Sequence, residues 1–113
     1  MTTTMRKLSS RKVQFGNLYW TVNSVDEKEL PENCLGQCSP PMEATINILE
    51  QGGMEDIDTL LHEIIHAMDF AHSIKLTENQ TDRLAYMFSM FLRDNAWIHK
   101  YVDQKVKEEY YNA

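Results

Sequence analysis

Two histidines and a glutamate near the middle of the chain have the types and spacing of a metal-dependent hydrolytic site. The segment His62-Glu63-Ile64-Ile65-His66 reads H-E-x-x-H. Histidines four residues apart lie on one face of an α-helix, so both imidazoles can bind one Zn²⁺ through nitrogens at about 2.0–2.1 Å. Glu63 has the place of the residue that takes a proton from the metal-activated water. The pattern therefore predicts zinc-assisted hydrolysis, with His62 and His66 as metal ligands.

The residues around this motif favour a partly buried helix. H-E-x-x-H fixes only three positions, and an isolated match more often lies on an exposed helix face. Here apolar residues recur at helical spacing through the same segment, which places the histidines beside an apolar stripe. We expect this motif helix to begin near residues 54–56 and to run to about His72. The apolar residues are Leu60, Leu61, Ile64, Ile65 and Met68.

A catalytic zinc site needs three protein ligands and one open position, so a third ligand must come from elsewhere. We favour Glu78, which opens the predicted second helix, because a helix hairpin folds that helix back alongside the first. Asp82, one turn further on the same face, is the reserve candidate. His72 has the spacing of the third ligand in H-E-x-x-H-x-x-G-x-x-H, but Asp69 replaces the turn-forming glycine. In a continuing helix His72 points roughly 120° away from His66.

Two further roles in such a site have candidates between which the sequence does not decide. Asp69 falls on nearly the same helix face as His62, where it would either orient a ligand histidine or face the solvent. The oxyanion of the transition state needs a hydrogen-bond donor besides the metal. Tyr86 or Tyr101 could supply that donor.

The chain before the motif has the residue types and turn signals of short strands. β-Branched and aromatic residues over 13–15 and 18–22 flank a Gly-Asn pair, which predicts a hairpin. The alternation over 44–49 predicts a third strand. Residues 36–42 contain two consecutive prolines and are expected to interrupt the sheet.

Two further helices are expected after the motif helix. Thr77 and Gln80 have the spacing of a capping box at the start of the first of them. Apolar residues at helical spacing then predict a core face on this helix, and a final helix after the interruption at 94–95. The apolar residues of the two helices are Leu84, Ala85, Phe88, Phe91 and Leu92, and then Trp97, Ile98, Tyr101, Val102 and Val106. The predicted fold class is α+β: a small antiparallel sheet of about three strands packed on two or three helices.

Length and composition indicate one domain without a nucleic-acid-binding or membrane-spanning role. The chain has 113 residues, of which 42% are hydrophobic and 25% charged. Its net charge of −6 lacks the basic surface of a nucleic-acid binder. No apolar run suits a membrane span or a signal peptide, so we expect a cytoplasmic protein with Cys34 and Cys38 as free thiols. Residues 1–10 are expected to be a disordered tail, and 11–113 a single domain.

The order of these features resembles the small zincin-like metallopeptidases of phages and mobile elements, and distantly the ImmA/IrrE and SprT-like groups. The resemblance covers roughly residues 13–95 and implies that an edge strand, here 44–49, binds the peptide substrate by strand addition. It also supports Glu78, because an acidic residue opens the helix after the motif in such proteins. Gln80 stands where the ImmA-like pattern is often acidic. The matching segments are 35–38, 45–48, 59–69, 76–78, 83–85 and 92–95.

These observations predict a zinc-dependent metallopeptidase acting on a peptide or protein. His62, His66 and Glu78 would bind Zn²⁺, and Glu63 would act as the general base and then pass the proton to the leaving amine. The alternative is a catalytically inactive zincin-fold protein, such as a phage-encoded inhibitor or regulator, with a structural metal. A metal-free helical adaptor is a third interpretation.

Overall fold

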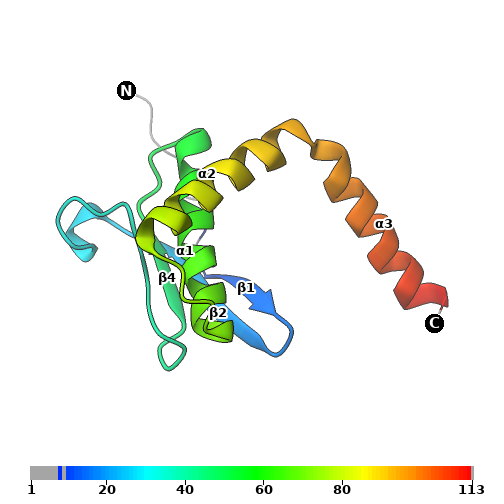
Figure 1. The fold of residues 1–113 in the computed structure, drawn as a ribbon, viewed down its shortest axis with the longest axis horizontal. Helices are drawn as coiled ribbons and strands as arrows, with labels where there is room; N and C mark the ends of the chain where they lie inside the picture. The colour runs from blue at the N-terminus through cyan, green and yellow to red at the C-terminus, as the bar shows by residue number, and fades with distance from the viewer. Residues whose placement is uncertain (1–7, 9, 113) are drawn as a thin grey trace.

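In the described residues, four strands and three long helices form an N-terminal sheet and a C-terminal helical part (Figure 1). The computed structural model describes residue 8 and residues 10–112. The class is α+β, as predicted from the sequence. The elements in chain order are β1 (Arg11–Phe15), β2 (Leu18–Ser24), a 3₁₀ turn (Glu27–Glu29), β3 (Gly36–Cys38), β4 (Thr45–Ile48), α1 (Met54–His72), α2 (Glu78–Asp94) and α3 (Ala96–Asn112).

The sheet begins with the predicted hairpin. β1 and β2 pair antiparallel, with Phe15 opposite Leu18. Gly16 between them has a φ of 61°, a value that glycine adopts without steric cost. The strand order is β1-β2-β4-β3, and β2 and β4 run parallel. The sheet therefore has one strand more than the predicted three, and one of its three strand pairs is parallel instead of antiparallel. The connection over 25–44 is long enough to return the chain for a parallel pair.

The free edge of the sheet nearest the motif helix differs from the predicted one. The strand expected over 44–49 exists as β4, but β4 pairs with β2 on one side and with β3 on the other. The edge strand is β3, which lies in the segment 36–42 that was expected to interrupt the sheet. Pro40 and Pro41 lie in the turn after β3 and not in the strand itself. Their influence on the backbone therefore begins only after the three residues of β3.

The core lies between the sheet and α1. Trp20, Val22, Ile46 and Ile48 from the sheet form one buried cluster with Ala67 of α1. Ala67 has no exposed surface, and its short side chain lets the helix approach the strands closely. Helix α1 has the predicted limits. Its last turn ends in a left-handed residue at position 73, whose backbone N–H donates to the carbonyl of residue 69 at 2.7 Å.

Helix α2 begins as predicted but packs through different residues. The Thr77 hydroxyl accepts the Gln80 N–H at 3.1 Å, and the Gln80 side chain accepts the Thr77 N–H at 2.9 Å, which completes the capping box. The buried residues are Thr81, Ala85 and Ser89, so small side chains at four-residue intervals form the face toward α1. The predicted core face is therefore wrong apart from Ala85 and the half-buried Leu92. Leu84, Phe88 and Phe91 are exposed.

Helix α3 is present as predicted, but it leads away from the rest of the chain (Figure 1). Trp97 is 63% exposed and Tyr101 is 54% exposed, so the apolar residues of α3 do not join the core. The Cα radius of gyration is 15.3 Å, compared with about 13 Å for a compact chain of this length. None of the helices in the described ranges is both long and apolar enough to cross a bilayer.

The predicted tail over 1–10 lies mostly outside the described residues. The two of its residues that are described make contacts with the sheet. Leu8 packs against the buried cluster, and the Ser10 N–H donates to the Asn23 side chain at 3.3 Å. Contacts with the sheet therefore begin on the N-terminal side of the predicted boundary at 11.

The position of Ile46 yields a stability prediction. Ile46 is fully buried in the central strand β4, so Ile46→Ala removes packed atoms and leaves a cavity. We expect a loss of about 2–5 kcal/mol in the free energy of unfolding, measured by urea titration followed by circular dichroism. Met42, 99% exposed in the preceding turn, is the matched control. Met42→Ala should change the free energy of unfolding by less than about 0.5 kcal/mol. Equal effects of the two substitutions would contradict the assigned core.

Candidate metal centre

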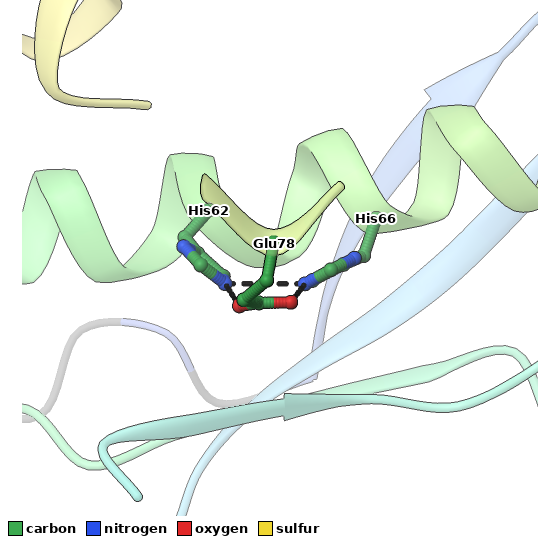
Figure 2. A group of neighbouring side chains, drawn as sticks. All are labelled: His62, His66 and Glu78. Atoms are coloured by element: carbon green, nitrogen blue, oxygen red, sulfur yellow. Dashed lines mark hydrogen bonds and ion pairs between the residues drawn. The ribbon is translucent and has the colours of Figure 1, made fainter. Parts of the chain in front are cut away.

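Three side chains from two helices converge on one point. Figure 2 shows His62 and His66 of α1 and Glu78 of α2 pointing toward one another. The Nε2 atoms of the two histidines are 3.1 Å apart. Glu78 Oε1 lies 2.6 Å from His62 Nε2, and Glu78 Oε2 lies 3.2 Å from His66 Nε2. The structure thus brings together the three residues that the sequence predicted as metal ligands.

The connection between α1 and α2 places Glu78 at this point. The Asp69 carboxylate accepts the backbone N–H of Lys75 at 2.6 Å and that of Leu76 at 3.0 Å. The capping box at Thr77 then starts α2, so Glu78 is its first helical residue. These bonds fix where the chain reverses between the helices. Asp69 therefore stabilises the connection between the helices. Both of its carboxylate oxygens bind backbone N–H groups of the loop, so Asp69 does not orient a histidine, which was one of its two predicted roles.

Asp82 orients a histidine instead. Its Oδ1 lies 2.9 Å from Nδ1 of His62, on the opposite side of the imidazole from the Nε2 that faces Glu78. A carboxylate bound to the second ring nitrogen of a metal-binding histidine fixes the tautomer and raises the basicity of the ligand nitrogen. Asp82 was the reserve candidate for the third ligand, and its geometry supports this positioning role.

The donor atoms fit a bound cation. When His62 donates its Nδ1–H to Asp82, a neutral imidazole presents the Nε2 lone pair to the Glu78 carboxylate. Two acceptors 2.6 Å apart repel each other unless a proton or a metal ion lies between them. Two nitrogens and a carboxylate are also a ligand set that catalytic zinc uses. In an ideal tetrahedral site ligand atoms are about 3.3 Å apart, close to the 3.1 and 3.2 Å distances here.

The other sequence candidates lie away from this cluster. His72 is the exposed last residue of α1 and does not belong to the group of converging ligand atoms. The helix continues through position 69, so the chain makes no early turn that could bring His72 back toward the cluster. Tyr86 and Tyr101 are exposed, and neither is among the residues that line the cleft beside the histidines. Their predicted role as oxyanion donors is therefore not supported.

Glu63 lies buried between α1 and the edge strand. It is 6% exposed and faces Gly36 of β3. Burial raises the pKa of its carboxyl, the two neighbouring histidines lower it, and Glu78 raises it, with a net increase. A carboxylate with a raised pKa is a stronger proton acceptor, which is the property that a general base needs.

The edge strand provides the room for this carboxylate. A Cβ atom on Gly36 would lie 2.9 Å from Glu63 Oε2 and 3.1 Å from the Thr59 side chain. Cys38, two residues on, shares the same side of β3 and lies beside Glu63. Burial and the Glu63 charge raise the pKa of its thiol to about 12, so the thiol is protonated at neutral pH. Both cysteines are free thiols, as predicted.

A cleft of about 590 Å³ opens over the cluster, which is within the usual size range of ligand-binding sites. One wall is the segment 33–38, which includes β3. The other walls come from α1 and from the first turns of α2. Sequence reasoning missed the first wall, because its strand is only three residues long. The glycine at position 36 was the available signal, since glycine inside a strand often marks a close approach of another group.

Comparisons with protein-family models, with curated proteins and with solved structures found no match to this chain.

The ligand assignment predicts a ranking of zinc affinities. Glu78→Ala removes both carboxylate oxygens from the cluster and should weaken zinc binding strongly. His72→Ala should leave zinc binding nearly unchanged, because His72 lies outside the cluster. Competition titration with a chromophoric zinc chelator measures both variants against the unsubstituted chain. If His72→Ala has the larger effect, the predicted ligand set is wrong.

The role of Asp82 predicts a smaller, graded effect. Asp82→Asn keeps the size of the side chain but removes the charge that orients His62. Zinc affinity should fall by about 10–100-fold, as is typical for loss of such a partner. Asp58 also lines the cleft but is no part of the ligand cluster, so Asp58→Asn is a matched control with little expected effect. Equal affinities for Asp82→Asn and the unsubstituted chain would exclude the positioning role.

Proposed function

We propose that this chain is a zinc-dependent peptidase. The observation that carries the proposal is the meeting of the H-E-x-x-H face of α1 with Glu78 of α2, beside a buried Glu63 and an open cleft. His62, His66 and Glu78 would hold the metal, and a tetrahedral ion would keep a fourth position free toward the cleft. The resemblance to small zincin-like metallopeptidases favours the same function.

The chemistry divides between the metal and Glu63. Bound Zn²⁺ would activate a water molecule and polarise the scissile carbonyl. Glu63 would accept the proton of that water on its carboxylate and later transfer it to the leaving amine. The missing side chain at Gly36 leaves the space in which the carboxylate lies. The proton is thus held in a buried position between two transfers, where bulk water competes little for it.

We also propose that the substrate binds along β3. The Leu35 carbonyl accepts the Leu49 N–H, and the Ser39 N–H donates to Thr45, so the odd-numbered positions of β3 pair inward with β4. By the alternation of antiparallel pairing, the backbone groups of Gly36 and Cys38 face the free edge. An extended peptide could add to this edge with its backbone over the cleft. This assigns to β3 the role that the resemblance had suggested for 44–49.

The cleft wall carries groups suited to a polar backbone and an apolar side chain. Asn33 lines the cleft, and its side-chain amide could donate to the oxyanion in place of the two tyrosines. Phe70 lies at the same cleft on the side of His66. Its exposed ring offers an apolar contact for a substrate side chain. A peptide with an apolar residue near the cleaved bond would fit these groups.

The decisive variant is Glu63→Gln. It keeps the shape of the side chain and a hydrogen-bonding amide but provides no basic carboxylate. Cleavage should fall by about 10²–10⁴-fold, the usual contribution of a general base. The assay exposes a mixture of diverse peptides to the zinc-loaded protein and identifies new termini by mass spectrometry. Elemental analysis should find about one zinc per chain in both proteins, because Glu63 is not a ligand in this assignment.

Three outcomes would contradict the proposal in different ways. Absence of zinc after reconstitution would remove the metal site. Zinc binding without cleavage of any peptide would favour the alternative of an inactive zincin-fold protein that binds a partner. Cleavage that persists unchanged in Glu63→Gln would show that another group acts as the base.

A further inference from the structure

Two apolar surfaces in the described part of the chain are uncovered. The first, here called the hairpin face, lies on the helix hairpin that α1 and α2 form, and not on the β1–β2 hairpin. The second, the α3 face, lies on the helix that projects from the body (Figure 1). All of the side chains below are between 36% and 63% exposed, which is unusual for so many large apolar residues in a chain of this length. The hairpin face consists of Ile57, Met68, Leu84, Phe88 and Phe91, and the α3 face of Trp97, Tyr101, Val102 and Val106.

The hairpin face lies on the opposite side of the α1–α2 pair from the metal centre. At about 100° per residue, Met68 is roughly 120° around α1 from His62, with the buried Ile65 between them. On α2, Phe88 is roughly 120° from Asp82, with the buried Ala85 between them. The two apolar stripes therefore flank the helix contact on one side, and the ligands flank it on the other.

The connection to α3 prevents it from covering the hairpin face of its own chain. Only Asn95 separates α2 from α3. Its side chain donates to the Phe91 carbonyl at 2.9 Å, and its carbonyl accepts the Ile98 N–H at 3.0 Å. Antiparallel helices joined by a tight turn need about 2–5 connecting residues. One residue with both polar groups bonded to the adjoining helices cannot reverse the chain, so α3 must find its contact elsewhere.

We propose that the chain forms a symmetric dimer in which the α3 face of each copy packs on the hairpin face of the other. Each copy then supplies one uncovered helix and one uncovered surface, and a two-fold axis satisfies both at once. The exchange is reciprocal, as in domain swapping. It places the metal centre on the side of the hairpin that the partner does not cover.

The area available is that of a stable dimer. A fully exposed aromatic side chain presents about 150–250 Å², and the two faces include four aromatic side chains at about half exposure together with five other partly exposed apolar side chains. The exposed apolar area of the two faces is therefore on the order of 700 Å² per copy, close to the roughly 800 Å² that each partner contributes to a standard interface.

The charges favour a contact between a helix and a body over a contact between two bodies. The chain has a net charge of −6. Within α3 three lysines balance three carboxylates, so the helix is neutral and the whole excess lies on the remainder of the chain. Two bodies of like charge repel each other, whereas a neutral helix approaches without that cost. Within α3, Lys107 lies 3.0 Å from Asp103 and Lys105 lies 3.2 Å from Glu108, and the Lys105 ammonium also lies 5.5 Å from the centroid of the Tyr101 ring.

Sedimentation of the full chain over about 1 to 100 μM tests the proposal, since dimerisation depends on concentration. The expected mass is twice the 13.2 kDa of one chain at the upper end of this range. Phe88→Glu and Tyr101→Lys should each raise the dissociation constant by at least about tenfold, because each places a charge in the apolar contact. Lys100→Glu, at a position outside the α3 face, is the matched control and should remain dimeric. A monomer at every concentration would overturn the proposal.

Mixing the two variants tests the arrangement. In a mixed pair one contact retains both original faces, and the other places the introduced lysine beside the introduced glutamate. The mixture of Phe88→Glu and Tyr101→Lys should therefore dimerise more tightly than either variant alone. A dimer held by α3 against α3 would gain no intact contact on mixing. Failure of the mixture to exceed both variants would overturn the exchange, and circular dichroism would verify that both variants keep their helices.

Discussion

The arrangement of the candidate site depends on the close packing of α1 against α2. Thr81, Ala85 and Ser89 are small and buried, so the two helix backbones approach each other closely along this stripe. That approach brings the first turn of α2 beside the two histidines of α1. A zinc ion needs its ligands within a few ångströms of one another, which a wider helix pair could not provide. Large residues at these three positions would separate Glu78 from the histidines without touching the site itself.

Two acidic residues outside the candidate ligand set determine the geometry of the site in different ways. Asp69 binds two backbone N–H groups of the connection and so determines where α2 begins. Asp82 binds one histidine side chain and so determines which ring nitrogen faces the cluster. Asp69 thus acts through the backbone of the connection, whereas Asp82 acts through the position of the proton on the His62 ring. The sequence alone does not distinguish these two roles, because both residues are acidic and both lie on a helix near the motif.

Local patterns predicted the parts of the fold that local interactions determine. The limits of α1, the hairpin turn at Gly16 and the capping box at Thr77 each depend on residues a few positions apart. The prediction failed where the outcome depends on distant segments. Strand β3 is too short to carry a pattern of its own and forms because β4 and the buried Glu63 lie beside it. The expected core face of α2 failed because apolar periodicity identifies a stripe but not whether the chain itself covers that stripe. Phe88 shows this most clearly, since it has the right spacing and remains 48% exposed.

The α1–α2 pair thus has two sides with opposite chemistry. On one side lie the candidate ligand atoms, and a metal ion would reach them through the open cleft. On the other side lie Met68, Leu84 and Phe88, whose apolar surfaces are exposed to water. Burial of these surfaces against a partner would be favourable. A partner that covers the apolar side would stabilise the contact between α1 and α2. The spacing of the candidate ligands on the polar side depends on that same helix contact. Binding at the apolar side would therefore stabilise the metal geometry without blocking the cleft, so that in the proposed dimer assembly and metal affinity are thermodynamically linked.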